Sequence, residues 1–284
     1  MERILICCNI ERDPEMQVTR DILDRLHGRG VWAKAFLPFG GEPPAEMDAQ
    51  YLCSEPEEAI RGCDLLLCLG GDGTMLHLSK LAARNGVPML GINLGKVGFI
   101  TGLELEELDR LDDVLSGDYV IENRMMLDVE VLRGDHSVYR GFGLNEALVT
   151  RMNPAHAIHL TAYGDNQKIS DYSGDGIIIA TPTGSTAYSM AAGGPIVEPT
   201  AENLILTPVC AHSLTAKAYV LAGDRRTSVK VIRSEDGILL VDGEESFPLQ
   251  VGDLVYVKKS DYVTKLVKVR SPSFYEIVKN KLNV

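Results

Sequence analysis

LLLCLGGDGTML (residues 65–76) joins five apolar residues directly to three glycines that bracket a single aspartate, Asp72. An unbroken apolar run is typical of a strand that is covered on both faces, as in parallel sheets. The glycines and the helical pattern that follows them predict a loop whose free N–H groups bind an anion. A carboxylate has the wrong charge for such a loop, so the presence of Asp72 needs an explanation of its own.

The alternation of strand and helix continues on both sides of this stretch. Strands are predicted over 3–9, 31–37, 65–69 and 88–92. Helices are predicted over 14–27, over 55–61 after a Ser54 cap, over 74–84 and over 104–115. Such alternation implies a parallel sheet with right-handed crossovers. Residues 1–118 are therefore expected to form an α/β domain with a Rossmann-like parallel sheet.

The pattern changes near residue 120, and the rest of the chain is predicted to be predominantly β. Short strand-like segments such as LDVEVLR, GIIIATP and GILLVDG are separated by turn signals such as RGDH and SEDG. A short helix over 185–192 interrupts them. We expect a β-rich domain over 119–265, and a C-terminal tail over 266–284 that returns to the N-terminal domain. The predicted fold class is a two-domain α+β protein.

The composition argues against several classes of function. The chain has 284 residues and a net charge of −12, whereas a general nucleic-acid or membrane-surface binder needs a basic face. No apolar run approaches the roughly 20 residues of a membrane span, and the polar start does not resemble a secretory signal. None of the six cysteines forms a C-x-x-C pair, and most lie in apolar runs. Reduced thiols and a cytoplasmic protein are expected.

Two familiar phosphate-binding loops fail on this sequence. The dinucleotide pattern G-x-G-x-x-G fails because Leu76 stands where a third glycine is needed. The Walker pattern fails at GINLGKV, where Gly91 is one residue too close and Val97 follows the lysine. Two interpretations of GGDG remain open. Asp72 either caps the helix in a tight turn, or projects at the ligand-binding edge of the sheet as a general base toward a hydroxyl.

Further motifs accompany the glycine loop along the chain. They are GINLGKVGF (91–99), NEA (145–147), DG-III-ATPTGSTAYS-AAGGPI (175–196) and VDG (241–243). With GGDGT (70–74), and in this order, they closely resemble the NAD kinase family. The resemblance covers about residues 65–245. GGDGT also occurs in lipid kinases, but TPTGSTAYS joined to GGPI is much more specific.

The resemblance implies an NAD kinase, which makes NADP from NAD. Such an enzyme moves the terminal phosphoryl group of ATP, or of polyphosphate, to the 2′-hydroxyl of the adenosine ribose of NAD. Asp72 is then the general base, and Mg²⁺ or another divalent cation is bound with the donor, without a dedicated protein metal site. NAD and ATP are the implied partners, with no nucleic acid and no membrane. A homodimer or homotetramer is expected.

The resemblance also implies which residues bind the nucleotides. Asn145 suits an adenine edge because its amide both donates and accepts, and Glu146 and Asp175 suit ribose hydroxyls. The implied set is Gly71, Gly73, His77, Phe99, Asn145, Glu146, His156, Ser173, Asp175, Thr183, Thr186, Ala187, Tyr188, Ser189, Ala191 and Asp242. Purely structural interpretations stay open beside these roles: strand-edge polar residues at 145–146, a turn aspartate at 175, and surface histidines at 77 and 156.

Two other functions remain as alternatives. A lipid kinase would share GGDGT, but it has no use for TPTGSTAYSMAAGGP and would want an apolar or basic membrane-facing surface. A non-catalytic NAD(P) or nucleotide sensor would gain nothing from a carboxylate beside phosphates. Ser173 and His77 stand where members of the family place arginine, so their roles are less defined than that of Asp72.

Overall fold

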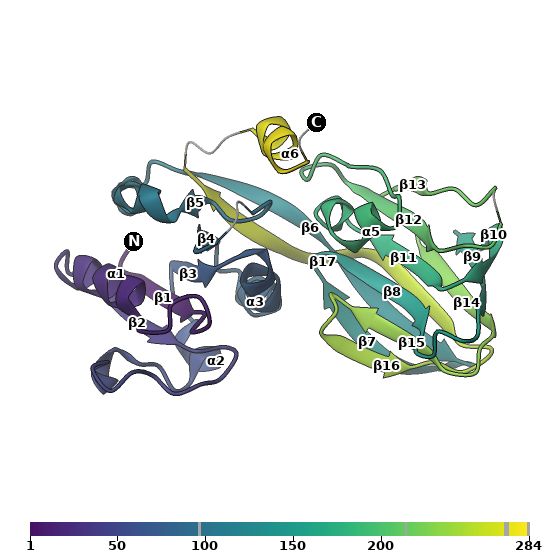
Figure 1. The fold of residues 1–284 in the computed structure, drawn as a ribbon, viewed down its shortest axis with the longest axis horizontal. Coiled ribbons are helices and arrows are strands. Elements are labelled where there is room, and N and C mark those ends of the chain that lie inside the picture. Colours follow the sequence, from purple (N-terminus) through teal and green to yellow (C-terminus); the bar gives the residue numbers. More distant parts are fainter. Residues whose placement is uncertain (96–97, 214, 270–272, 283–284) are drawn as a thin grey trace. The chain divides into compact units, whose positions relative to one another are not determined.

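The chain divides into two compact units, and the second is inserted into the first along the sequence. Unit 1 consists of Met1–Asn123 and Thr264–Val284, and unit 2 of Arg124–Val263. The computed structural model describes residues 1–95, 98–213, 215–269 and 273–282 (Figure 1). Lys96 and Val97 of the GINLGKVGF motif therefore lie outside the described residues. The parallel α/β sheet and the antiparallel β-rich part are both confirmed.

Unit 1 is built on a parallel sheet with the strand order β2-β1-β3-β4. Its strands are β1 (Arg3–Cys8), β2 (Trp32–Phe36), β3 (Leu65–Gly70) and β4 (Met89–Asn93). The short β5 (Leu103–Glu104) and the end of β17 (Leu254–Lys268) also pair with β4. Every residue of β3 and β4 is buried, as the unbroken apolar pattern predicts.

The helices of unit 1 begin and end close to the predicted bounds. They are α1 (Gln17–His27), α2 (Pro56–Ala59), α3 (Asp72–Asn85), α4 (Leu111–Ser116) and α6 (Phe274–Leu282), with 3-10 helices η1 (Ala49–Tyr51) and η2 (Leu105–Arg110). The predicted Ser54 cap is wrong, because Glu55 is the N-cap of α2 and Pro56 is its first residue. The predicted helix over 104–115 is a 3-10 segment followed by a short α-helix.

The parallel register brings three loops together at one edge of the sheet. Cys8 pairs with Leu69, and Gly70 pairs with Asn93, so β1, β3 and β4 end side by side. The loops that follow these strands contain Asn9 and Arg12, then the GGDG turn, and then Leu94 and Gly95. The carboxyl edge of such a sheet is where open α/β folds bind ligands.

Unit 2 consists of antiparallel strands in two sheets. The first contains β6 (Val120–Arg133), β7 (His136–Gly143), β9 (Ile158–Gly164), β10 (Gln167–Gly174), β14 (Thr227–Arg233) and most of β17. The second has the order β13-β12-β11-β8-β15-β16. Its strands are β8 (Glu146–Arg151), β11 (Gly176–Ala180), β12 (Asn203–Val209), β13 (Tyr219–Ala222), β15 (Gly237–Val241) and β16 (Glu245–Pro248). Apolar side chains from both sheets form one buried cluster.

The helix predicted over 185–192 is divided in two. A 3-10 turn, η3 (Gly184–Thr186), precedes a four-residue helix, α5 (Tyr188–Ala191). The division falls at Ala187, whose φ of −98° and ψ of −131° lie outside the helical region. The TPTGSTAYS motif therefore forms a compact turn after β11 instead of one regular helix.

Candidate active site

The GGDG turn connects β3 to α3 and leaves the first amides of the helix free of intrahelical partners. Gly71 is the N-cap, and the helix begins at Asp72, two residues before the predicted start. Gly70 allows the turn to close, because a Cβ at this position would overlap the hydroxyl of Thr74. The turn thus presents N–H groups and the positive end of a 14-residue helix to the sheet edge.

Asp72 does not cap the helix. No side-chain capping bond is made at the N-terminus of α3. The carboxylate turns instead toward the GINLGKVGF loop, where Oδ2 accepts the Phe99 N–H at 2.8 Å and Oδ1 accepts the Ile100 N–H at 3.1 Å. Gly98 makes this approach possible, because a Cβ there would overlap Oδ1. The helix-cap interpretation is therefore wrong, and Asp72 is held in position by the next loop along the sheet edge.

Lys281 of α6 is a further neighbour of Asp72 that sequence reasoning did not identify. Its Nζ lies 3.5 Å from Asp72 Oδ2 and 4.1 Å above the centroid of the Phe99 ring. The contact joins residues 209 positions apart in the chain. The only related prediction was that the C-terminal tail returns to the N-terminal domain. The lysine places a positive charge beside the candidate base and packs on an aromatic face.

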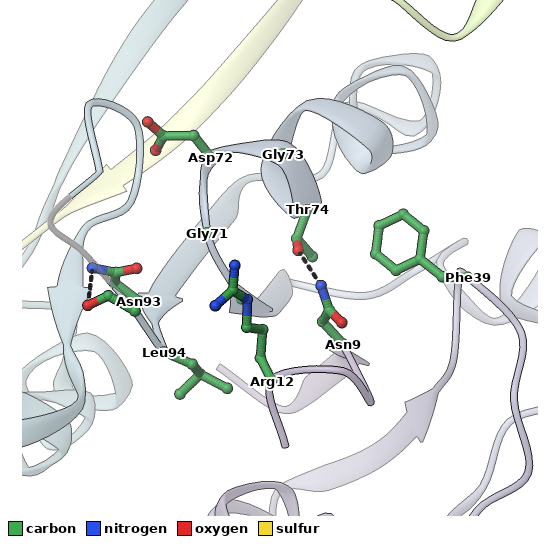
Figure 2. Close-up of a pocket in the computed structure, with 11 residues that line it drawn as sticks. Asn9, Arg12, Phe39, Gly71, Asp72, Gly73, Thr74, Asn93 and Leu94 are labelled. Carbon is green, nitrogen blue, oxygen red and sulfur yellow. Dashed lines mark hydrogen bonds between the residues drawn. The ribbon is translucent and has the colours of Figure 1, made fainter. Parts of the chain in front are cut away.

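A cavity of about 540 Å³ opens beside the glycine turn in unit 1 (Figure 2). It is lined by Asn9, Arg12, Phe39, Gly70, Gly71, Asp72, Gly73, Thr74, Asn93, Leu94 and Gly95. Asn9 ties the first loop to the turn, since its Nδ2 donates to Thr74 Oγ1 at 3.2 Å. His77, one turn into α3, lies with its ring 4.7 Å from that of Phe39. Unit 1 thus brings Gly71, Asp72, Gly73, His77 and Phe99 into one region.

In unit 2, Asp242 organises the start of β8. Its carboxylate accepts the N–H groups of Leu144 at 2.7 Å, Asn145 at 2.8 Å and Glu146 at 3.0 Å. Asp242 has a φ of 55°, in the left-handed region, where it turns β15 into β16. Asp242 therefore has a structural role: it fixes the backbone of Asn145 and Glu146. Its implied contact with the nucleotide stays a prediction.

Glu146 is held in an environment that disfavours its charge. Burial, and secondarily the Asp242 carboxylate, raise the pKa of Glu146 from 4.5 to about 8. Within the described part of the chain, its Oε2 has no hydrogen-bond partner. Near pH 7 the side chain of the free protein therefore carries a proton, and it can donate as well as accept a hydrogen bond. This differs from the acceptor-only role expected from the residue type.

Glu146→Gln is expected to stabilise the protein increasingly as the pH rises. The folded pKa lies above the unfolded one, so the stability conferred by neutral Glu146 is complete below about pH 4.5 and is lost toward pH 8. Glutamine stays neutral at every pH, so the variant avoids this loss. Each unit of difference between the folded and unfolded pKa corresponds to about 1.4 kcal/mol of stability. The variant should match the wild type at pH 5 and exceed it by on the order of a few kcal/mol at pH 9, measured by denaturant unfolding. The exposed Glu198→Gln is the control, and equal gains at both pH values would contradict the shift.

The TPTGSTAYS segment packs directly against Asn145. The Thr181 N–H donates to the Asn145 carbonyl at 2.8 Å, and Thr181 Oγ1 donates to the Leu144 carbonyl at 2.6 Å. Gly184 lies so close that a Cβ would be 2.6 Å from the Asn145 carbonyl carbon. Thr183 is buried and accepts from Arg124 Nη1 at 3.3 Å. Unit 2 thus brings Asn145, Glu146, Thr183 and Asp242 together.

The other predicted residues of this segment differ in exposure. Ser189 is fully buried, and its hydroxyl lies 2.8 Å from that of Thr207. Thr186 donates to the Thr183 carbonyl at 3.2 Å. Tyr188 is 45% exposed. Ala187 is half-buried and Ala191 is exposed.

Three remaining candidates lie near the ends of strands in unit 2. Asp175 follows β10 and forms an ion pair with Arg151, whose Nε donates to it at 3.0 Å. The Ser173 hydroxyl lies 3.5 Å from His212 Nδ1. His156 lies on an exposed loop, where its Nε2 is 3.5 Å from Glu235 Oε2. The structure thus places His156 beside an acidic side chain.

The described residues contain no group of three or more His, Cys, Asp or Glu side chains arranged to hold a metal ion. Within the same residues, no helix is long and apolar enough to cross a membrane.

Comparison with known proteins adds to this geometry. A family model described as the ATP-NAD kinase N-terminal domain matches residues 46–119, and one described as the ATP-NAD kinase C-terminal domain matches residues 144–269. The first contains Asp72 and Phe99, and the second contains Asn145, Glu146, Asp175, the TPTGSTAYS turn and Asp242.

The sequences of related proteins match most or nearly all of this chain. The NAD kinase of Caldanaerobacter subterraneus is 34% identical over 290 residues, covering 99% of this chain and 99% of that protein. The NAD kinase of Carboxydothermus hydrogenoformans is 39% identical over 231 residues, covering 81% and 82%.

Solved structures agree in fold. Yeast NADH kinase complexed with NADH has a TM-score of 0.82 at 26% identity, covering 99% of this chain and 88% of that one. An NAD kinase from Archaeoglobus fulgidus in complex with ATP has a TM-score of 0.72 at 25% identity, covering 100% and 99%.

Proposed function

The chain belongs to the NAD kinase family, and we propose that it transfers the terminal phosphoryl group of ATP to the 2′-hydroxyl of the adenosine ribose of NAD, giving NADP. The observation that carries this proposal is the position of Asp72. Its carboxylate stands at the first turn of α3, beside the free amides of the glycine turn and fixed by the Phe99 and Ile100 N–H groups. A proton acceptor and a phosphate-binding turn therefore adjoin each other.

In the proposed reaction Asp72 accepts the proton of the ribose 2′-hydroxyl. The hydroxyl oxygen forms a bond to the terminal phosphorus of the donor, and the bond from that phosphorus to the bridging oxygen breaks, releasing ADP. Phosphoryl transfer depends mainly on positioning and charge neutralisation, so the turn amides supply hydrogen bonds to the phosphates. Oδ1 of Asp72 accepts one hydrogen bond, from the Ile100 N–H, so its second lone pair remains able to accept the hydroxyl proton.

The proposed NAD-binding residues lie mainly in unit 2. Asn145 recognises an adenine edge, and its backbone position is set by Asp242 and by contact with Gly184. Glu146 and Asp175 bind ribose hydroxyls. Gly71, Gly73, Phe99 and His77 of unit 1, with Thr183, Thr186, Ala187, Tyr188, Ser189, Ala191, Ser173 and His156 of unit 2, complete the proposed set.

Mg²⁺ is the proposed cofactor and is carried by the phosphates of the donor. When bound, it neutralises charge on the transferred phosphoryl group. The residues near the turn fit this arrangement, since one buried amide oxygen, Asn93 Oδ1, lacks a partner among the described residues and needs a donor such as a metal-bound water. Polyphosphate is a second donor within the same proposal, because the turn recognises phosphates and not a base.

A homodimer or homotetramer is also proposed. β13 is an edge strand of the second sheet in unit 2, and it exposes Tyr219 and Val220. Exposed apolar residues on an edge strand favour self-association. Size-exclusion chromatography with light scattering should show a mass of two or four times that of the 31.0 kDa chain.

The proposed activity is tested by incubating the purified protein with NAD, ATP and Mg²⁺. NADP is then measured with an NADP-specific dehydrogenase, and reactions without ATP or without protein serve as controls. NADP should accumulate in proportion to enzyme and time. Parallel reactions with polyphosphate, or with NADH, define the donor and the acceptor. The absence of NADP in all of them would contradict the proposal.

A further inference from the structure

The C-terminal helix α6 places a lysine beside the proposed base, within the same compact unit (Figure 1). The helix has a reciprocal cap at its first turn. The Glu276 N–H donates to Ser273 Oγ at 3.3 Å, and the Ser273 N–H donates to Glu276 Oε2 at 2.7 Å. Ile277 is buried in the middle of α6, and Lys281 lies one turn later on the same face. The packing of α6 therefore sets the position of Lys281.

The Lys281 ammonium contacts the two residues that define the base. Its Nζ donates to Asp72 Oδ2 at 3.5 Å and lies 4.1 Å from the centroid of the Phe99 ring. The N–H of the same Phe99 donates to the same carboxylate oxygen at 2.8 Å. Oδ2 is thus held from two sides, whereas Oδ1 accepts the Ile100 N–H and keeps a lone pair for a hydroxyl.

The loop that holds Asp72 is contacted a second time by the C-terminal segment. Lys268, the last residue of β17, donates from Nζ to the Thr101 carbonyl at 3.2 Å. The loop is also tightly packed at Gly98, where a Cβ would overlap both Asp72 Oδ1 and the Thr101 hydroxyl. The segment from Lys268 to Lys281 therefore supports the loop at Thr101 and at Phe99, on either side of the amide of Ile100.

The ion pair between Lys281 and Asp72 is poorly suited to stabilising the fold. The two side chains are 28% and 34% exposed, and pairs of this kind contribute little to the free energy of unfolding. A fixed direction of the carboxylate is what the pair can provide. Figure 2 shows this carboxylate directed away from Arg12, the arginine of the cavity wall. Lys281, and not Arg12, therefore faces the base.

We propose that Lys281 is a positioning residue for phosphoryl transfer. Its ammonium holds Asp72 Oδ2 against the Phe99 amide, and this keeps Oδ1 directed toward the ribose hydroxyl. The lysine exchanges no proton with the substrate, so the bonds that form and break are those of the reaction proposed above. Helix α6 thereby belongs to the active site, although it lies far from the glycine turn in the sequence. The inference rests on the proposed kinase function.

The kinetic test replaces Lys281 with methionine, which removes the charge and keeps most of the stem. The kcat for NADP formation should fall by about 10-fold or more, since a misplacement of about 1 Å can cost on the order of 10²-fold. The Kd for NAD and the Tm should stay at the wild-type values. Lys281→Arg keeps a positive charge and should recover part of kcat. Lys279→Met, an exposed lysine on the opposite side of α6, is the matched control and should leave kcat unchanged.

A double-mutant cycle tests whether Lys281 acts through Phe99. Phe99→Leu removes the aromatic ring and keeps the N–H that donates to Asp72. If the lysine is held in place by the ring, the loss of kcat in the double variant is smaller than the product of the two single losses. Losses that multiply fully would show that the two side chains act independently, and would overturn the proposed route.

Hydrogen exchange of the free protein tests the same contact without turnover. The Phe99 and Ile100 amides donate to Asp72, so Lys281→Met should speed their exchange by roughly 2- to 5-fold, the factor that corresponds to a partly exposed ion pair. The amides of α6 should exchange as in the wild type. Faster exchange throughout α6 with a lowered Tm would assign Lys281 a structural role and overturn the proposal.

Unchanged exchange at Phe99 and Ile100 would also overturn it, as would an unchanged kcat in an active enzyme. The proposed function fails separately, if the wild type makes no NADP. The exchange measurement then still decides whether Lys281 holds the Asp72 carboxylate, because it needs neither substrate nor turnover.

Discussion

Replacing Asp72 is expected to abolish most of the turnover without preventing the binding of NAD. Loss of a positioned general base typically lowers kcat by about 10²–10⁴-fold. Asp72→Asn is the smallest change, but its amide would direct N–H donors at the Phe99 or Ile100 N–H groups that the carboxylate now accepts. Asp72→Ala avoids this conflict. Both variants should show kcat lowered by about two orders of magnitude or more, with a nearly unchanged Kd for NAD by calorimetry.

Chemical rescue separates a lost base from a displaced loop. The alanine variant leaves space for a small carboxylate, so added formate should restore part of the turnover if proton transfer is the missing step. Asp24→Asn, an exposed aspartate on α1, is the control and should keep wild-type kinetics. Near-normal turnover of both Asp72 variants would remove Asp72 from the role of base. Loss of turnover without rescue, together with a lowered Tm, would assign it a structural role.

Gly184→Ala is expected to disturb the proposed adenine site through a direct backbone clash with Asn145. The added Cβ would overlap the Asn145 carbonyl oxygen and lie 2.9 Å from the Asn145 Cα, and neither backbone can rotate away. Overpacking of this kind typically costs about 1–3 kcal/mol or more. The Tm should fall by several degrees. The KM for NAD should rise by roughly 10-fold, because a shift of Asn145 removes a hydrogen bond worth about 1 kcal/mol and leaves its partner unpaired.

A matched glycine shows whether the contact or the residue type is responsible. Gly164 in β9 has an ordinary φ, and a Cβ there would meet only the Ile169 side chain at 3.6 Å. Gly164→Ala should therefore change neither the Tm nor the KM appreciably. A Gly184→Ala variant with an unaltered KM for NAD would show that Asn145 does not recognise the nucleotide, or that the segment relaxes without moving it.

The fold was predictable where the local pattern and the tertiary environment agree. The apolar runs of β3 and β4 are buried on both faces, so pattern and structure coincide there. Helix starts were less predictable. The start of α3 at Asp72 depends on Gly71 at the N-cap, and the division of the 185–192 segment depends on the backbone angles of Ala187. Both of these helix boundaries depend on how the turns pack in the folded protein, and the local periodicity of the sequence does not indicate that packing.

The candidate site was predictable only in part. The motifs identified Asp72 and the Asn145–Glu146 pair, but the roles of Lys281 and Asn93 arise from contacts between distant segments. Glu104, which orients Asn93, stands 11 positions away, and Lys281 meets Asp72 through a helix at the far end of the chain. The raised pKa of Glu146 likewise depends on burial and on Asp242, 96 positions later. Residue types alone do not contain this information.

The insertion of unit 2 into unit 1 has a consequence for biosynthesis. During translation the Asp72 turn leaves the ribosome early, but the end of β17 and α6, which belong to unit 1, are made only after unit 2. At about 5–20 residues per second, the 209 positions between Asp72 and Lys281 take about 10–40 s to synthesise. Throughout that interval β4 lacks its pairing with the end of β17, where Leu266 lies opposite Met89. Translation products that end within unit 2 therefore contain the GGDG motif but lack α6, so they have no Lys281 to contact Asp72.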